Sequence, residues 1–87
     1  MYQIVVGKRV YKDLDDIPAI DVEKLNEAIR NLANNPRPNH CKKLVTKINY
    51  YRIRQGNYRI VYEILDKQKI VNILGVGHRK DIYRKFV

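Results

Sequence analysis

The stretch YYRIRQGNYRIVYEIL at residues 50–65 decides the fold, because two runs rich in β-branched and aromatic residues flank Gly56 and Asn57. Glycine adopts positive φ freely and asparagine does so more readily than most residues, so this pair is typical of a primed two-residue turn in a β-hairpin. The expected register, which a four-residue loop would also keep, pairs Gln55 with Tyr58, Arg54 with Arg59, Arg52 with Val61, and Tyr50 with Glu63.

Alternation along these two strands divides their side chains between two faces. The apolar set, which we expect to face the core, is Tyr51, Ile53, Tyr58, Ile60 and Tyr62. The opposite set is Tyr50, Arg52, Arg54, Arg59, Val61 and Glu63. Like charges directly opposite each other destabilise a sheet by up to about 1 kcal/mol, so packing does not explain Arg54 facing Arg59. Guanidinium groups held on neighbouring strands instead indicate a phosphate site.

The composition bounds the class of protein. Eighty-seven residues suffice for one domain, residues 1–87, with one small core. A net charge of +9 is typical of a nucleic-acid-binding protein, although an anionic membrane surface or an acidic protein could use the same charge. Cys41 is the single cysteine, which excludes a disulfide framework and favours a reducing compartment. No apolar run approaches the roughly 18 residues that cross a bilayer, so we expect a soluble, cytoplasmic protein that does not use a membrane.

The remaining elements follow from periodicity and turn residues. We expect a strand at 2–6, a short helix at 8–15, an edge strand at 42–47 and a strand at 70–76. Between them we expect an amphipathic helix of about four turns that begins near Pro18 and repeats its apolar residues over 22–32. The predicted fold is an α+β domain in which a helical hairpin, about 8–34, packs on one face of a twisted, mainly antiparallel four- to five-stranded sheet. The first strand pairs within that sheet, and a short helix forms within 77–87.

A second turn at 66–69 extends the sheet. If its loop spans four residues, Leu65 pairs with Ile70, Val61 with Leu74, and Arg59 with Val76. The arginine-bearing face of the sheet, opposite the core, then becomes apolar away from the Gly56–Asn57 turn. Its apolar strip consists of Val61, Leu65, Ile70, Leu74 and Val76. An exposed strip of this kind needs a cover. We expect either Ile82 and Phe86 of the terminal helix or a helix of a partner to provide it.

The side chains available for chemistry are mostly cations. The sequence contains no Ser-His-Asp set, no paired carboxylates and no metal-ligand cluster at readable spacing, and a metal site made from His40, Cys41 and His78 is a weak alternative. The remaining candidates are Arg52, Arg54, Arg59, Arg79, Lys42, Lys43, Lys47 and Tyr83. RNA cleavage requires activating the 2′-hydroxyl, neutralising charge on the phosphorane and protonating the leaving oxygen.

Each candidate also has a structural interpretation. The lysines of 42–47 could protect a sheet edge from association, and Tyr83 could be a half-buried ring packed on the sheet. Arg59, which we expect to be exposed, could form a salt bridge to Glu63 or Asp81. Against the structural interpretation of Tyr83, Arg79 lies one helical turn away and would favour the ionised phenolate.

Four segments resemble one family: NPRP at 35–38, KKL at 42–44, YRIRQGNYRIVYEIL at 51–65 and ILGVGHRKDIYRKF at 73–86. Together they are similar to the RelE toxins of the RelE/ParE superfamily in bacterial and archaeal toxin-antitoxin systems. The resemblance implies a ribosome-dependent, metal-independent and cofactor-free endoribonuclease that cleaves mRNA in the A site.

The resemblance also implies roles for particular residues. Arg59 stabilises transition-state charge, Arg79 binds phosphate or protonates the leaving group, and Tyr83 activates the 2′-hydroxyl and stacks on a base. Lys42, Lys43 or Lys47 contacts phosphate, as Arg52 and Arg54 are also expected to do. His78 is a lower-ranked acid or base, and no counterpart of the catalytic glutamate of some relatives is evident unless Glu63 serves.

Two other functions stay open at this point. One is a ParE-like toxin that poisons DNA gyrase without cutting RNA, and the other is a domain that binds RNA without cleaving it. A toxin also implies partners: the ribosome, mRNA and a cognate acidic antitoxin. We expect a segment of that antitoxin to lie on the arginine-bearing face, where it either displaces residues 79–86 or neutralises Arg52, Arg54 and Arg59.

Overall fold

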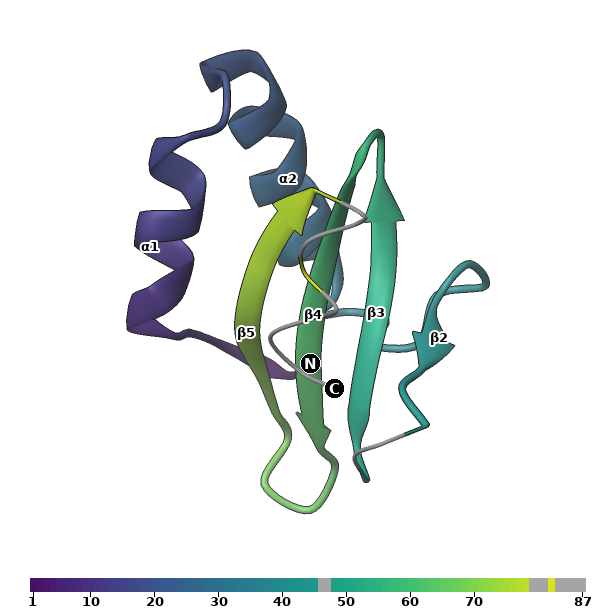
Figure 1. Cartoon of the computed structure of the whole chain (residues 1–87). Coiled ribbons are helices and arrows are strands. Elements are labelled where there is room, and N and C mark those ends of the chain that lie inside the picture. The colour runs from purple at the N-terminus through teal and green to yellow at the C-terminus, as the bar shows by residue number, and fades with distance from the viewer. Residues whose placement is uncertain (46–47, 79–81, 83–87) are drawn as a thin grey trace.

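The structure is a computed structural model, and it describes residues 1–45, 48–78 and 82. Within them the elements are β1 (Gln3–Val6), α1 (Lys8–Asp15), α2 (Ala19–Asn31), β2 (Lys42–Lys43), β3 (Tyr50–Gln55), β4 (Tyr58–Leu65) and β5 (Ile70–His78). This arrangement confirms the predicted α+β class (Figure 1). The predicted C-terminal helix lies outside the described residues, apart from Ile82.

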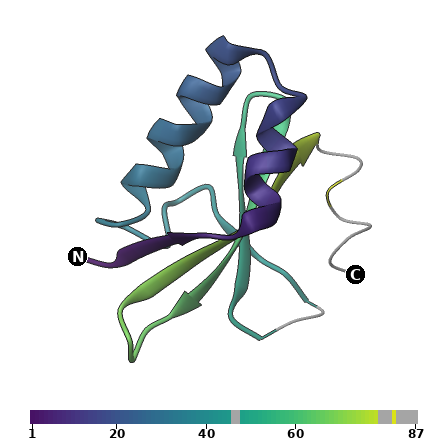
Figure 2. The ribbon, with the colours of Figure 1, turned by 90° about the vertical axis from the view of Figure 1, so that its left-hand side faces the viewer.

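The five described strands form one sheet in the order β1-β5-β4-β3-β2. β1 is an edge strand that pairs in parallel with β5, whereas the other neighbours are antiparallel, as expected for a mainly antiparallel sheet. Figure 2 shows the strands fanned across one another, as in a twisted sheet, with the helical hairpin of α1 and α2 to one side.

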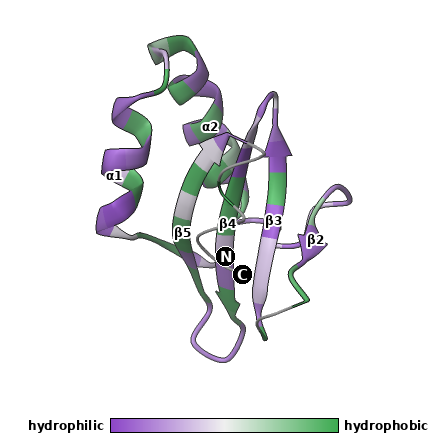
Figure 3. Ribbon diagram, viewed as in Figure 1, coloured by the Kyte–Doolittle hydropathy of each residue, from purple (hydrophilic) through white to green (hydrophobic). Residues whose placement is uncertain are grey.

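The β3–β4 hairpin has the predicted register in full, from Gln55 opposite Tyr58 to Tyr50 opposite Glu63. Gly56 has a φ of 62°, and Asn57 does not have positive φ. Positive φ at the first turn position alone is the pattern of a type II′ turn, one of the two primed turns that match strand twist. Figure 3 shows β3 changing between hydrophilic and hydrophobic colour along its length, whereas β2 is hydrophilic.

The core lies between the helical hairpin and the apolar face of the sheet. Val10 of α1 and Leu25 of α2 are both fully buried against this face. The predicted core-facing set is confirmed: Ile53, Ile60 and Tyr62 are buried, and Tyr51 and Tyr58 pack against the cluster. The helices are therefore placed on one face, and the arginine-bearing face of the hairpin points away from them.

The predicted register between β4 and β5 is partly wrong. Leu65 does pair with Ile70, but a β-bulge between Val61 and Tyr62 shifts the ladder, so that Val61 pairs with Gly75 instead of Leu74 and Arg59 pairs with Gly77 instead of Val76. Because a bulge inserts one extra residue, the β5 residues beyond it exchange faces: those expected to face away from the core face it, and the reverse.

The bulge also corrects the predicted apolar strip. Val76 belongs to the helix-side core and is 1% exposed, so it is not part of the arginine-bearing face. Val61 is fully buried, while Leu65, Ile70 and Leu74 are half-buried.

The predicted edge strand is much shorter in the structure, whereas the start of the second helix agrees with the prediction. The expected strand at 42–47 extends only over Lys42 and Lys43, and Val45 beyond it is fully exposed. The second helix begins at Ala19, directly after Pro18, which confirms the predicted start near Pro18. Proline is favoured at helix starts because its fixed φ suits the first turn and it lacks an N–H that would need a partner.

Candidate functional site

The β3–β4 hairpin places cations together on the face opposite the helices. Arg54 of β3 lies directly across from Arg59 of β4, and Arg52 lies across from Val61. On its other side Arg52 is the Cα partner of Lys42 in β2. Because directly paired residues share a face, the register gathers Arg52, Arg54, Arg59 and Lys42 on one surface. We call these four residues the cationic face.

Arg54 also has a local structural role within this face. Its Nε donates a hydrogen bond of 2.9 Å to the carbonyl oxygen of Gly56 in the hairpin turn. This bond fixes the guanidinium beside the turn and offsets part of the repulsion from Arg59. Arg54 is exposed, so the remainder of its guanidinium is open to an anion.

Arg59 is less exposed than the sequence predicted. The side chain is half-buried, and its Nη1 atom is buried. The strand on its other side contributes Gly77, which has no side chain. A rigid, partly desolvated guanidinium interacts more strongly with an anion than one in bulk water, because the local dielectric constant is lower.

Ile82 covers the sheet beside Arg59. A Cβ added to Gly77 would lie 3.4 Å from Ile82 Cδ1, so the isoleucine packs directly over this glycine. Ile82 is 1% exposed and Val61 on the same face is fully buried, which agrees with the predicted cover by Ile82. Phe86, the other predicted cover, lies outside the described residues, as do three predicted site residues, Lys47, Arg79 and Tyr83.

Two predicted site residues belong to the opposite side of the sheet. Lys43 pairs with Tyr51, whose ring faces the core side. His78 pairs with Tyr58, and the two rings meet edge to face with centroids 5.9 Å apart. The described structure therefore does not bring Lys43 or His78 onto the cationic face. Their assignments as phosphate-binding residue and acid or base stay predictions.

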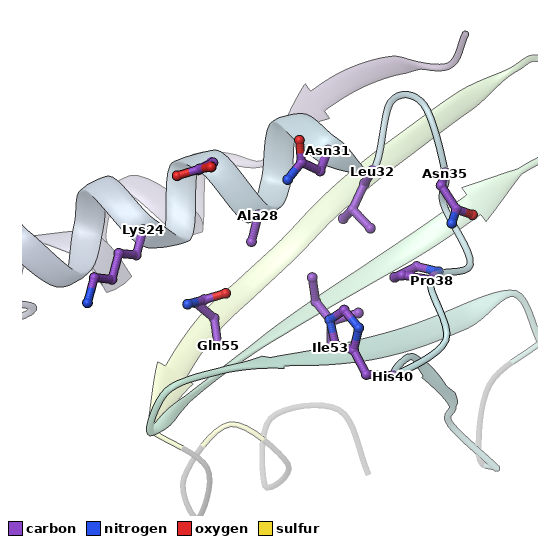
Figure 4. A pocket seen from close by; sticks show the side chains of 10 residues that line it. Lys24, Ala28, Asn31, Leu32, Asn35, Pro38, His40, Ile53 and Gln55 are labelled. Carbon is purple, nitrogen blue, oxygen red and sulfur yellow. The ribbon is translucent and has the colours of Figure 1, made fainter.

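Two of the hollows formed by the described residues flank the core on the helix side. One, of about 380 Å³, lies between α2, the loop at 35–40 and β3, with Leu32, His40 and Gln55 among its lining residues (Figure 4). The other, of about 550 Å³, lies between α1 and the ends of β4 and β5, and His78 and Asp13 line it. Among residues 1–45, 48–78 and 82, no three His, Cys, Asp or Glu side chains are placed to hold a metal ion.

A polar cluster of Tyr2, Arg37 and Asp66 at the turn between β4 and β5 was not predicted. Asp66 of the second turn accepts two hydrogen bonds from Arg37, at 3.2 and 2.8 Å, and one from the Tyr2 hydroxyl at 2.6 Å. The Arg37 guanidinium also lies 5.2 Å from the ring centroid of Tyr51. The hydrogen bonds from Arg37 and then Tyr2 lower the pKa of Asp66 to about 2, and the bond to Asp66 raises the pKa of Tyr2.

Tyr62 connects the loop at residues 35–38 to the core. Its ring is fully buried, stacks on Tyr51 at 6.0 Å, and its hydroxyl donates a 2.7 Å hydrogen bond to the Pro36 carbonyl. Burial raises the pKa of Tyr62, and the nearby Cys41 thiol adds to this effect. Tyr62 is therefore a structural phenol that stays neutral.

Comparison with known proteins gives a consistent result. Residues 4–83 match the family described as ParE toxin of type II toxin-antitoxin system, parDE. Toxin RelE3 of Methanocaldococcus jannaschii is 35% identical over 97% of this chain and 98% of its own length. A second relative in that organism, named RelE1, is 33% identical over 95% of this chain and 96% of its own length.

Solved structures share the fold. The archaeal RelE-RelB complex from Pyrococcus horikoshii matches with a TM-score of 0.80 and 28% identity, over 92% of this chain and 97% of that chain. The RelB-RelE antitoxin-toxin complex from Methanococcus jannaschii matches with a TM-score of 0.76 and 32% identity, over 95% and 99% of the two chains. In the described part of this chain, neither helix is long and apolar enough to cross a membrane.

Proposed function

This chain belongs to the RelE-type toxins of type II toxin-antitoxin systems, and from that premise we propose that it is a ribosome-dependent endoribonuclease that cleaves mRNA in the A site. The observation that carries the proposal is the cationic face, above all the direct pairing of Arg54 with Arg59. Two guanidinium groups opposite each other on rigid strands are costly without an anion and suit a phosphodiester with one.

The proposed reaction needs no group beyond protein side chains and RNA. The 2′-oxygen of a ribose attacks the adjacent phosphorus, a 2′-oxygen–phosphorus bond forms, and the bond from phosphorus to the 5′-oxygen of the next nucleotide breaks. The proton of the 2′-hydroxyl goes to a base and the departing 5′-oxygen takes one from an acid, leaving a 2′,3′-cyclic phosphate and a 5′-hydroxyl. In this scheme Arg59 stabilises the negative charge that accumulates on the phosphorane.

The acid and base are proposed from the family resemblance. Tyr83 would activate the 2′-hydroxyl and Arg79 would bind phosphate or protonate the leaving oxygen, with His78 as a lower-ranked candidate. Tyr83→Phe separates the hydroxyl from the ring: we expect cleavage to fall while RNA binding stays near that of the parent protein. Full cleavage by Tyr83→Phe would remove Tyr83 as the base.

Partners follow from the same premise. We propose that a cognate acidic antitoxin holds the toxin inactive, since the net charge of +9 favours an acidic protein and fast encounter at low salt. The half-buried Leu65 and Ile70, next to buried Val61, form an apolar surface to which a segment of the antitoxin would bind. Hydrogen exchange on free and bound toxin tests the mode: weaker protection of residues 79–87 on binding supports displacement, and stronger protection there contradicts it.

A second candidate function is kept because the matched family is described as a ParE toxin. A ParE-like toxin would poison DNA gyrase by binding and would not need the cationic face for chemistry. This alternative and the nuclease make opposite predictions for the same sample of protein.

One experiment separates the candidates. Purified toxin is incubated in parallel with translating ribosomes, with bare mRNA, and with gyrase and supercoiled DNA. The proposal expects mRNA cleavage in the first reaction only. Cleavage of bare mRNA would contradict ribosome dependence. Inhibited gyrase with intact mRNA would favour the ParE-like function, and RNA binding without cleavage in any reaction would favour the binding domain.

A further inference from the structure

We propose that Asp13 is a positioning residue of the Arg59 site. From α1 it holds β5 at Val76, just after the register shift between Ile73 and Gly75, and thereby keeps Gly77 opposite Arg59. The effect on cleavage that this predicts rests on the proposed nuclease function, whereas the effect on the strand does not. The proposal is built from one hydrogen bond, one register shift and one packing contact.

The hydrogen bond joins the first helix to the last strand. Asp13 Oδ2 accepts a bond of 3.0 Å from the backbone N–H of Val76, and the site is partly buried. β1 pairs with β5 only as far as Ile73, so among the described residues no strand lies beside the outer edge of β5 beyond that residue. α1 begins two residues after β1 ends and packs along this part of β5. A carboxylate is a strong acceptor for an edge amide that would otherwise be desolvated.

The register shift determines what Arg59 faces. Val71 and Ile73 point into the core before the bulge, and Val76 does so after it. With regular alternation from Ile73, Val76 would instead point at the other face, and its branched side chain would lie across from Arg59. The bulge puts Gly77 there. Asp13 bonds to Val76, the first core-facing residue after the bulge, so it holds the strand in the shifted register.

The packing contact connects this register to the chain that follows. Ile82 sits over Gly77, with Cδ1 3.4 Å from where a Cβ would be, and is 1% exposed. A Cβ at Gly77 would just touch Ile82, so a larger, branched side chain there would press on the isoleucine. Arg79 follows Gly77 by two positions in the sequence and Tyr83 follows Ile82 by one. The position of Gly77 therefore determines where Ile82 packs on the sheet, and Ile82 lies between the two proposed catalytic residues in the sequence.

The sequence carries a sign of this role. Asp13 lies three residues after the buried Val10 on α1, so it lies close to the helix face that packs on the core. A carboxylate on such a face is costly unless it is hydrogen-bonded. The bond to the Val76 amide meets that requirement.

The first test measures the strand itself by NMR on labelled full-length toxin. In Asp13→Ala we expect faster exchange of the Val76 amide, a shifted Ile82 δ1 methyl signal and a weakened nuclear Overhauser effect between that methyl and the Gly77 α-protons. Asp13→Asn keeps an oxygen acceptor and should restore all three. Asp16→Ala removes the same charge at the exposed end of α1 and should change none of them. Signals in Asp13→Ala that match the parent protein would overturn the proposal.

The second test measures cleavage on translating ribosomes. Displacement of catalytic groups by about 1 Å costs up to about 100-fold in rate, so we expect kcat of Asp13→Ala to fall about tenfold or more with KM unchanged. Asp13→Asn should stay within about threefold of the parent protein. Ile29→Val trims the core under α2, away from β5, and controls for a loss of stability alone. Unchanged kcat in Asp13→Ala would contradict the positioning role.

A variant at the other end of the proposed connection keeps the test decisive if Asp13→Ala does not fold. Gly77→Val puts a branched side chain opposite Arg59 without altering α1. It should displace the Ile82 methyl group, shift its NMR signal and lower kcat, as expected for Asp13→Ala. A normal Ile82 signal and normal kcat in Gly77→Val would overturn the proposal. If the parent toxin cleaves no RNA, the proposed function fails, and the NMR comparison alone then decides the role of Asp13.

Discussion

Arg59 lies directly across from Arg54 in one neighbouring strand and directly across from Gly77 in the other. Arg59 therefore has a second cation on one neighbouring strand and a glycine on the other, and Ile82 packs over that glycine. The two strands hold Arg59 in place, and its Nη1 atom is buried. A charge that is fixed before the substrate arrives needs little reorganisation when negative charge develops, which is the condition for transition-state stabilisation.

Lys42 and Lys43 provide a matched pair for testing which face binds RNA. The register puts Lys42 beside Arg52 on the cationic face and Lys43 beside Tyr51 on the other side. Lys42→Gln should weaken binding to single-stranded RNA and reduce the slope of log affinity against log salt concentration by about one. If RNA binds the cationic face alone, Lys43→Gln removes the same charge from the other side and should leave the slope unchanged, which would also end the prediction that Lys43 binds phosphate. Fluorescence anisotropy at several salt concentrations measures the affinity and the slope for both variants. Equal effects of the two substitutions would rule out the cationic face as the one surface that binds RNA.

Tyr62→Phe tests the bond that ties the 35–38 loop to the sheet. Removing the hydroxyl leaves the buried Pro36 carbonyl without its 2.7 Å donor, so we expect a loss of about 1 kcal/mol in the free energy of unfolding. For a domain of this size that corresponds to a Tm lower by about 4–8 °C. Tyr11→Phe removes an exposed hydroxyl from α1 and should leave Tm unchanged. Equal Tm values for Tyr62→Phe and the parent protein would show that this bond does not stabilise the fold.

Asp66 predicts a pH dependence of stability. Its pKa is lowered from 3.8 to about 2 in the folded protein, mainly by the hydrogen bonds from Arg37. A carboxyl group with a lowered folded-state pKa stabilises the fold fully above its unfolded pKa near 4, and this contribution is lost as the pH falls towards about 2. The loss should therefore occur between about pH 4 and pH 2.

The matched variant is Asp66→Asn, with Asp15→Asn at the exposed end of α1 as control. Thermal melts should show a lower Tm for Asp66→Asn than for the parent protein at pH 7, and the difference should shrink between pH 4 and pH 2. Because other carboxyl groups titrate in both proteins, the difference in Tm isolates Asp66. A difference that stays constant down to pH 2 would contradict the assigned shift.

The sequence predicted the hairpin well because its determinants are local. Gly56 and Asn57 set the turn, alternation sets the faces, and so the opposition of Arg54 and Arg59 follows from residues close together in the chain. The β4–β5 register was partly wrong because a bulge depends on the partner strand and on α1. Gly75 inside an apolar strand was the available sign, since an isolated glycine there indicates a bulge.

Other parts of the structure were beyond local inference. Tyr2, Arg37 and Asp66 come from three distant segments, and nothing in the spacing of these residues predicts that they meet. The assignment of Lys42 and Lys43 to opposite faces needed the register of β2 on β3. Asp13 was missed because its partner is a backbone amide 63 positions away, although its place close to the apolar face of α1 could have drawn notice.

The most direct test of the account compares the parent toxin with Arg59→Ala on translating ribosomes, with Arg30→Ala at an exposed position of α2 as the charge-matched control. The account predicts A-site cleavage of mRNA by the parent protein and by Arg30→Ala, and a rate lower by about 10²–10³ for Arg59→Ala, with a circular dichroism spectrum that shows the variant folded. Folded Arg59→Ala that cleaves at the parent rate would contradict the role of Arg59, on the cationic face, in stabilising the charge of the transition state.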